Sequence, residues 1–168
     1  MSLQEPWLRG TVTGLDPLRA QVLFSFEQAL EDAERFTNGC SDAEIWIRPY
    51  GLGSIGFHLA HITGSVDRLL TYALGQGLSE VQFTALQREK EQTSGREEAL
   101  RRFREALTRA GETVRKIAPG QYGEPRTVGR QKLPTTVGNL LVHISEHTQR
   151  HVGQIITTAA VVKGMAAN

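Results

Sequence analysis

Apolar residues recur every three or four positions along four long segments of the chain, the spacing that gathers them on one face of an α-helix. The first segment begins at Asp16-Pro17, an N-cap followed by a proline suited to the first helical position, and Asn38-Gly39 ends it. Its apolar stripe consists of Leu18, Val22, Phe26, Ala29, Ala33 and Phe36. The second segment begins near Ser54 and runs to Gly75. Both segments are predicted to be helices.

The third segment follows Ser94-Gly95 and has the most regular pattern, with the steps of three and four that are typical of packed helices. Its apolar positions are Leu100, Phe103, Leu107, Ala110, Val114 and Ile117. Charged residues of both signs lie between them, which indicates a solvated helix surface with ion pairs rather than a nucleic-acid-binding face. Pro119-Gly120 stops this helix. The stretch from Ser79 to Gln92 fits either a shorter helix or an ordered connection.

The fourth helix is predicted to start at Thr135 or Thr136 and to continue to about Lys163, with Gly164 as its C-terminal stop. The preceding stretch, residues 121–134, is polar and contains glycines, so we expect a loop long enough to cross the molecule. Four long helices with one long crossover loop before the last indicate an all-α four-helix bundle. A length of 168 residues suits a single domain, which we place at residues 1–168.

Charge balance and cysteine content narrow the classes of function. Lys and Arg number 19 and Asp and Glu 18, so the net charge of +1 gives no field that would collect nucleic acid. The one cysteine, Cys40, cannot form an intrachain disulfide and is expected to be a free loop thiol in a reducing compartment. Residues 1–6 lack the pattern of a signal peptide, and no apolar stretch approaches the roughly 20 residues of a membrane span. We therefore expect a cytoplasmic protein that contacts neither nucleic acid nor a membrane.

Three of the five histidines, His143, His147 and His151, lie four residues apart on the predicted fourth helix. Four residues advance a helix by about 400° and about 6 Å, so adjacent histidines nearly stack and can chelate one cation. The outer two, about 12 Å apart, cannot share one. His147 and His151 take positions where the periodicity calls for leucine or isoleucine. Buried imidazoles need polar partners, which either core hydrogen bonds or a metal cation would supply.

A zinc ion held by two histidines needs at least a third ligand. The candidates are His58 and His61 of the second helix, which lie about 60° apart around its axis. His58 is slightly closer to the apolar stripe, whereas an open metal site needs a ligand at the stripe's margin, where His61 lies. The spacing alone leaves both candidates open. His143, at the margin of the fourth helix, could be a partner of a metal ligand, a substrate contact or an ordinary polar residue.

The other polar residues near the histidines are expected to have ordinary roles. Glu146, Gln149 and Arg150 are turned away from the histidine pair, and we expect their side chains to face solvent. Gln154 lies one turn beyond Arg150, and we expect it to have a structural role.

Residues Ser54–Ile62, SIGFHLAHI, begin with serine and isoleucine and lead to a histidine that an aliphatic residue follows. Residues Leu141–Gln154, LVHISEHTQRHVGQ, carry histidines four apart and close on glycine and glutamine. Together with Ser41–Trp46 and Arg48-Pro49 ahead of the second helix, these stretches resemble the motifs of the DinB/YfiT-like family. The resemblance covers about Leu15 to Val162 and implies a DinB/YfiT-like four-helix bundle with its core in that range.

Carried over position by position, the resemblance implies metal ligands at His61, His147 and His151. It implies a three-histidine centre for zinc or nickel at an open cleft of the bundle, in a protein that forms a homodimer. Val152 stands where the family often has an arginine, so an anionic substrate contact from that position is not expected.

The resemblance also implies a metal-dependent enzyme. Relatives include thiol-dependent transferases and isomerases and metal-dependent hydrolases. We therefore expect a metal that activates a low-molecular-weight thiol for S-transfer to an electrophile, or water for hydrolysis. The sequence contains no convincing nucleophile or paired carboxylates that would carry the chemistry instead. The alternative is a non-catalytic, stress-related binding or dimerisation bundle with a structural metal or none.

Overall fold

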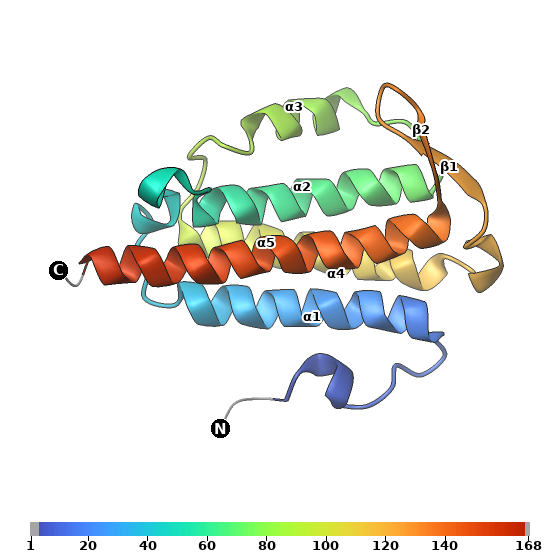
Figure 1. Ribbon diagram of the computed structural model, residues 1–168, viewed down its shortest axis with the longest axis horizontal. Coiled ribbons are helices and arrows are strands. Elements are labelled where there is room, and N and C mark those ends of the chain that lie inside the picture. The colour runs from blue at the N-terminus through green and yellow to red at the C-terminus, as the bar shows by residue number, and fades with distance from the viewer. Residues whose placement is uncertain (1–3, 167–168) are drawn as a thin grey trace.

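Four long helices lie side by side along the long axis of the protein (Figure 1). The structure, a computed structural model, describes residues 4–166. Residues 1–3 and 167–168 lie outside the described residues, and the first of these groups belongs to the N-terminal segment in which no signal peptide is expected. The long helices are α1 (Pro17–Thr37), α2 (Ile55–Ala73), α4 (Arg96–Lys116) and α5 (Val137–Ala166). The shorter elements are the 3₁₀ turns η1 (Pro6–Leu8), η2 (Glu44–Trp46), η3 (Pro49–Gly51) and η4 (Pro119–Gln121), helix α3 (Glu80–Arg88) and strands β1 (Pro125–Val128) and β2 (Leu133–Thr136). The predicted all-α four-helix bundle is confirmed.

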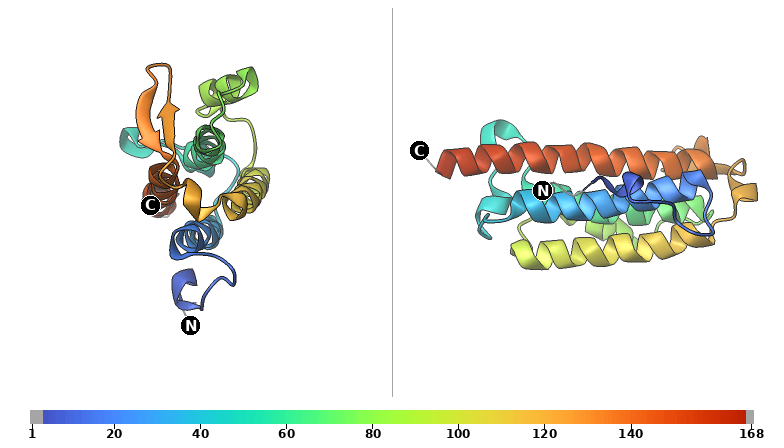
Figure 2. Two further views of the ribbon diagram at one scale, coloured as in Figure 1. Left: turned by 90° about the vertical axis from the view of Figure 1, so that its right-hand side faces the viewer. Right: turned by 90° about the horizontal axis from the view of Figure 1, so that it is seen from below.

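Helices that follow one another in sequence do not all pack together. Helix α1 packs against α4 and α5, and α2 packs against the same two, so α1 and α2 occupy opposite corners of the bundle (Figure 2). Helices α1 and α5 run in one direction and α2 and α4 in the other (Figure 1). The connections α1–α2 and α4–α5 therefore cross the two ends of the bundle diagonally. Because α2 and α4 are parallel neighbours, the chain must return between them, and α3 lies on this return path outside α2.

Side-chain caps set where the helices begin. The Asp16 carboxylate accepts a hydrogen bond from the Leu18 N–H at 3.1 Å, and the Ser54 hydroxyl accepts one from the Phe57 N–H at 3.1 Å. Each cap satisfies a backbone N–H that has no partner within its helix. Ser79 and Gln82 cap each other's backbone reciprocally at the start of α3. The stretch from residue 79 to 92 thus contains a short helix, one of the two predicted options.

The predicted loop at residues 121–134 was wrong in part, because it contains most of a β-hairpin. Strand β1 pairs antiparallel with β2, with Arg126 opposite Thr135. Each strand has only four residues and contains a proline, so its alternation signal in the sequence is weak. Helix α5 begins at Val137 rather than at Thr135 or Thr136, which belong to β2. It also continues past Gly164 to Ala166, since Gly164 does not take the left-handed conformation of a C-terminal stop.

The core forms where the apolar stripes of the four long helices meet. Phe26 of α1, Ile62 of α2, Phe103 of α4 and Ile144 of α5 are all buried. Their removal from water is the main favourable contribution to folding. A polar layer interrupts this apolar core where α2 faces α5, and its buried members are His58, Ser65 and Thr148. Buried polar groups on two facing helices mark the site described below.

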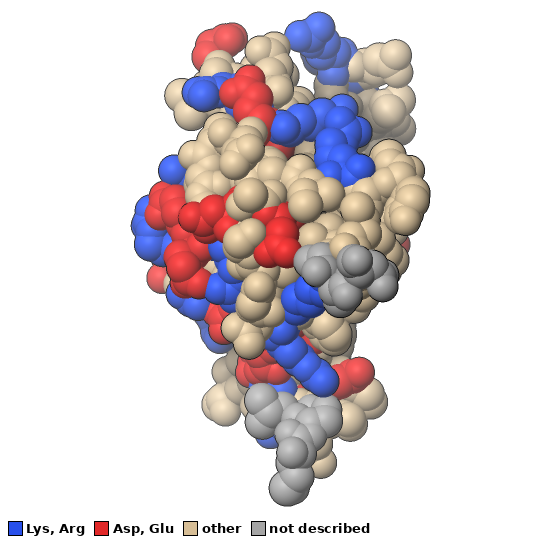
Figure 3. Space-filling view, turned by 90° about the vertical axis from the view of Figure 1, so that its left-hand side faces the viewer, with Lys and Arg blue, Asp and Glu red and all other residues tan. Residues whose placement is uncertain are grey.

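The surface carries charges of both signs. On α4, Glu98 binds Arg101 and Arg102 through carboxylate–guanidinium contacts of 2.7 and 2.6 Å, which confirms the ion-paired helix surface. One end of the molecule shows Lys and Arg interspersed with Asp and Glu (Figure 3). None of the helices formed by residues 4–166 combines the length and the apolar character that a membrane crossing requires.

Candidate metal centre

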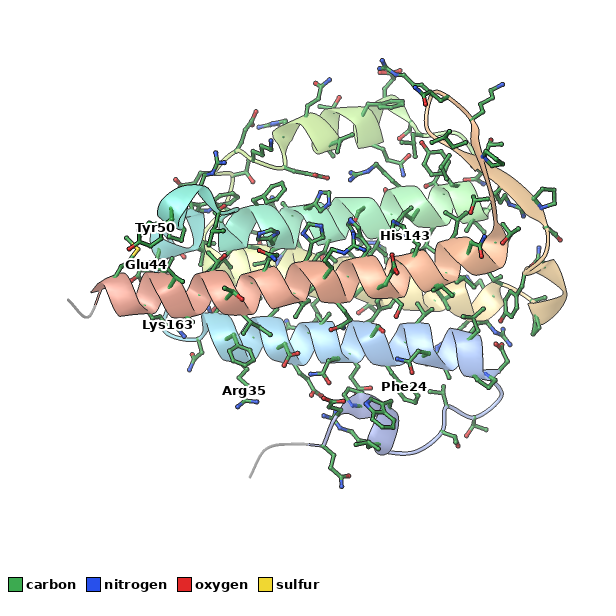
Figure 4. The ribbon with its side chains drawn as sticks, in the orientation of Figure 1. Phe24, Arg35, Glu44, Tyr50, His143 and Lys163 are labelled. Carbon is green, nitrogen blue, oxygen red and sulfur yellow. The ribbon has the colours of Figure 1, made fainter. Side chains whose placement is uncertain are left out.

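Three imidazoles meet between α2 and α5. His61 comes from α2, and His147 and His151 come from successive turns of α5. One ring nitrogen of each lies within 4.8 Å of a ring nitrogen of the other two. The Nε2 atoms of His61 and His147 are 3.4 Å apart, and the His151 ring centroid lies 4.5 Å from each of the other two. Side-chain nitrogens cluster in this region between the two helices (Figure 4).

The other ring nitrogen of each of these histidines has a partner from elsewhere in the fold. His61 Nδ1 lies 2.7 Å from Oε2 of Glu89, His147 Nδ1 lies 3.4 Å from the Ser65 hydroxyl, and His151 Nδ1 lies 2.9 Å from Nδ1 of His58. With the Nδ1 atoms occupied in this way, the Nε2 atoms of the three rings are the ones available to a common ion. Metal-binding histidines usually donate their second N–H to such a partner, which fixes the tautomer and the ring orientation. The donor set therefore fits a divalent cation.

Burial keeps two of these rings neutral. Burial, and then the positive charges that neighbouring rings would carry, lower the pKa of His147 and of His151 to about 4. At pH 7 both imidazoles consequently keep the free electron pair that a metal ligand needs. The arrangement is ready for a metal without first losing protons from these two rings.

His58 is also in the cluster, as a neighbour of His151. Its side chain is 5% exposed, and burial, followed by the nearby His151 and His61, lowers its pKa to about 4. Its Nε2 atom has no hydrogen-bond partner among the described residues. That atom points towards Gly53, where an added Cβ would lie only 2.6 Å away. The helical wheel thus placed His58 correctly on the inward side, while His61 is the residue whose ring completes the group of three.

Glu89 was missed by sequence reasoning. It follows the last residue of α3, is 6% exposed, and its carboxylate bridges His61 and Arg68, with an Arg68 contact of 2.7 Å. Gly64 leaves the space for this bridge, since a Cβ there would lie 2.6 Å from both Arg68 and Glu89. A buried acid needs such partners, but no local pattern indicates that α3 brings Glu89 to α2. A contact of this kind depends on tertiary packing alone.

The polar residues around the cluster on α5 differ in exposure. His143 is partly exposed at the cluster's edge (Figure 4); its Nδ1 lies 2.9 Å from the Glu146 carboxylate and its ring centroid 5.4 Å from that of His147. Glu146 and Arg150 are exposed, as predicted. The prediction for Gln149 was wrong, because its side chain is half-buried and donates to the Ser25 carbonyl of α1 at 2.8 Å. Helix α5 is covered on that side by α1, which its own periodicity does not reveal.

A cavity of about 520 Å³ opens beside the cluster, and we call it the histidine-side cavity. His61, His143 and His147 line it on one side, and Phe83 and Leu86 of α3 on another. A second cavity, of about 480 Å³, flanks α3 elsewhere and has no histidine in its lining. The histidine-side cavity gives a molecule bound in it direct access to the imidazole cluster.

The only cysteine offers no competing nucleophile. Cys40 is a free thiol, as predicted, but it is buried, and this burial raises the pKa of the thiol. A buried thiol with a raised pKa is a weak nucleophile near neutral pH. The chemistry of the centre would accordingly come from the imidazoles and an ion that they hold.

Comparison with known proteins agrees with this fold. The model of the DinB superfamily matches residues 25–155. Among solved structures, the chain is similar to YfiT from Bacillus subtilis, a probable metal-dependent hydrolase with an unusual four-helix bundle topology. The TM-score is 0.64 at 13% sequence identity, and the match covers 92% of this chain and 93% of YfiT. No curated protein sequence matches the chain. Because the family model spans most of the sequence, the protein belongs to the DinB superfamily.

Proposed function

We propose that this protein is a metal-dependent enzyme whose divalent ion is held by His61, His147 and His151. The observation that carries the proposal is the meeting of three imidazole nitrogens within 4.8 Å, with the second nitrogen of each ring occupied by another side chain. The similarity to YfiT, itself a probable metal-dependent hydrolase, supports a divalent ion in this position. Zinc and nickel are the proposed metals, since both accept neutral imidazole ligands.

Three protein ligands leave a coordination position for a further molecule. A divalent ion bound there supplies Lewis acidity, which lowers the pKa of a coordinated water or thiol. The proposed reaction is therefore hydrolysis by activated water or S-transfer from a low-molecular-weight thiol to an electrophile. No further protein nucleophile is required for either reaction.

The residues around the ligands have separate roles in this proposal. The Glu89 carboxylate accepts a hydrogen bond from the Nδ1–H of His61, which would leave Nε2 of that ring free to bind an ion. His58 is the corresponding partner of His151 Nδ1, and Ser65 is the corresponding partner of His147 Nδ1. His143 lines the histidine-side cavity, where its imidazole can contact a bound substrate.

The test combines metal content with activity. The protein is loaded with zinc or nickel, its metal content is measured by elemental analysis, and hydrolysis of esters and conjugation of low-molecular-weight thiols are assayed in parallel. We expect one ion per chain, loss of the ion in His147→Ala, and turnover in one of the two assays. Unchanged metal retention in His147→Ala would refute the ligand set.

The non-catalytic alternative makes a different prediction for stability. A structural metal would make folding depend on it, so a chelator would lower the unfolding midpoint strongly. The proposed open site predicts a smaller loss, because the bundle also has an extensive apolar core to which all four long helices contribute. The homodimer remains a prediction from the family resemblance, and sedimentation velocity would measure it directly.

A further inference from the structure

Helix α3 forms one wall of the histidine-side cavity and is bound to α2 near both of its ends. Near the start of α3, the Gln82 amide donates to the Asp67 carboxylate at 2.7 Å and to the Thr71 hydroxyl at 2.8 Å. Beyond its last turn, Glu89 binds Arg68 and His61 of α2. Helix α3 is thereby held against α2 at two points, and the cavity lies in the space between them.

The cavity walls between these two points are mostly apolar. Leu69 and Tyr72 of α2, Leu78 before α3, and Phe83 and Leu86 of α3 all contribute to the lining. A volume of about 520 Å³ falls within the range of small-molecule sites, which is roughly 300–1,000 Å³. Such a lining favours a molecule with an apolar body.

The charged groups in the lining are all cationic. No Asp or Glu among the described residues lines the cavity, whereas Arg68 and Arg130 do. The Arg68 guanidinium is already paired with Glu89. Arg130, in the turn of the β-hairpin, makes no side-chain hydrogen bond or ion pair with the described residues, and its guanidinium lies 6.0 Å from the centre of the Phe83 ring. Its hydrogen-bond donors therefore remain available to an anion.

We propose that the histidine-side cavity binds a small molecule with an apolar body and one carboxylate group, and that Arg130 pairs with the carboxylate. The apolar body lies between Leu69 and the α3 side chains, and the end opposite the carboxylate reaches His61 and His147. This proposal rests on the proposed function only in treating the bound molecule as a substrate of the metal centre. The hairpin thus acts as a selectivity element, since its turn supplies an arginine that has no ion-pair partner among the described residues.

The test compares a matched pair of probes. Binding of 4-phenylbutyrate and of its neutral amide, 4-phenylbutanamide, is measured by titration calorimetry at pH 8 on the full chain, both metal-free and zinc-loaded. We expect the carboxylate to bind about tenfold more tightly than the amide, the size of effect expected for a hydrogen-bonded ion pair. Arg130→Gln should bring the ratio of the two dissociation constants close to one, with the amide affinity retained.

Lys132→Gln is the matched control, because it removes a positive charge from the same hairpin turn but from a residue outside this cavity. This variant should keep the preference for the carboxylate. Leu86→Trp, on the partly exposed face of α3, should fill the cavity and weaken both probes. Equal affinities of the wild type for the carboxylate and the amide would overturn the proposal. A preference for the carboxylate that survives Arg130→Gln, or that disappears equally in Lys132→Gln, would do the same. Unchanged binding of both probes in Leu86→Trp would also overturn it.

Zinc affinity of the same variants separates this proposal from the proposed function. Arg130, Lys132 and Leu86 contact none of the three proposed ligands through a hydrogen bond or ion pair, so each variant should bind zinc like the wild type. Carboxylate selectivity in a chain that binds no metal would refute the metal enzyme and leave the cavity proposal standing. Normal zinc binding without a preference for the carboxylate would refute the cavity proposal and leave the metal enzyme standing.

Discussion

The Glu89 carboxylate lies 2.7 Å from Nδ1 of His61, so a residue just beyond α3 holds a ring of the imidazole cluster on α2. The same carboxylate binds the buried Arg68 guanidinium through its other oxygen. This contact connects α3, which forms one wall of the histidine-side cavity, to the proposed metal centre. It also explains why a short helix outside the bundle matters to the site.

Replacing Glu89 with glutamine should weaken metal binding by about 10- to 100-fold, the usual effect of losing a partner of a ligating histidine. The amide keeps the shape of the side chain but loses the charge that orients the His61 N–H and balances Arg68. Zinc affinity is measured by competition with a chelator of known affinity. Glu91→Gln is the control, since Glu91 is exposed and its carboxylate binds Arg88 rather than a residue of the cluster. Equal affinities in Glu89→Gln and wild type would contradict the assigned role.

Metal-free protein should lose stability as the pH falls from about 6.5 towards 4. His58, His147 and His151 have a pKa of about 4 in the folded state and an ordinary value of 6.5, so the unfolded chain binds more protons in this window. The contribution of these three neutral rings to the free energy of unfolding is fully present above pH 6.5 and is lost as the pH falls to the folded-state pKa. Each titrating histidine changes the free energy of unfolding by at most about 1.4 kcal/mol per pH unit, and by less where the ring is partly exposed.

Urea unfolding of chelator-treated protein at several pH values between 7 and 4.5 measures this dependence. His147→Leu removes one of the titrating rings and should give a shallower slope than the wild type. A free energy of unfolding that stays constant from pH 7 to 5 would show that the rings are not held neutral by burial.

Asp16 should contribute to stability through two elements at once. Its carboxylate caps α1 and also accepts a hydrogen bond from the Tyr122 hydroxyl at 2.8 Å, in the segment between α4 and the hairpin. Asp16→Ala should lower the free energy of unfolding by about 0.5–2 kcal/mol, the range found for lost N-caps. Asp16→Asn, which keeps a capping oxygen, should cost less. Unfolding curves in urea measure both variants, and equal midpoints for Asp16→Ala and wild type would rule this role out.

The long helices were predictable because their signals are local. Asp16 caps α1 as the sequence suggested, α2 begins directly after Ser54, near which its start was expected, and the apolar stripes repeat over many turns. The hairpin was missed because its strands are four residues long. Periodicity also says which residues share a face but not how much of the helix is covered, which is why Gln149 was expected in solvent although it packs on α1.

The candidate site was predictable only in part. The spacing of His147 and His151 placed both rings on one face, but the choice between His58 and His61 depends on how α2 is rotated against α5. Glu89 could not be found, because its approach to His61 depends on α3 folding back over α2. Residues that orient a site often come from separate elements, and their contacts are set by packing rather than by local pattern.

We propose that one ion binds among His61, His147 and His151. Diffraction from crystals of zinc-loaded protein, measured on both sides of the zinc absorption edge, locates the ion. We predict a single anomalous peak about 2.0–2.1 Å from the Nε2 atom of each of these three histidines. A peak at another place, or zinc-loaded crystals with no peak between α2 and α5, would show that these three histidines do not form the metal site.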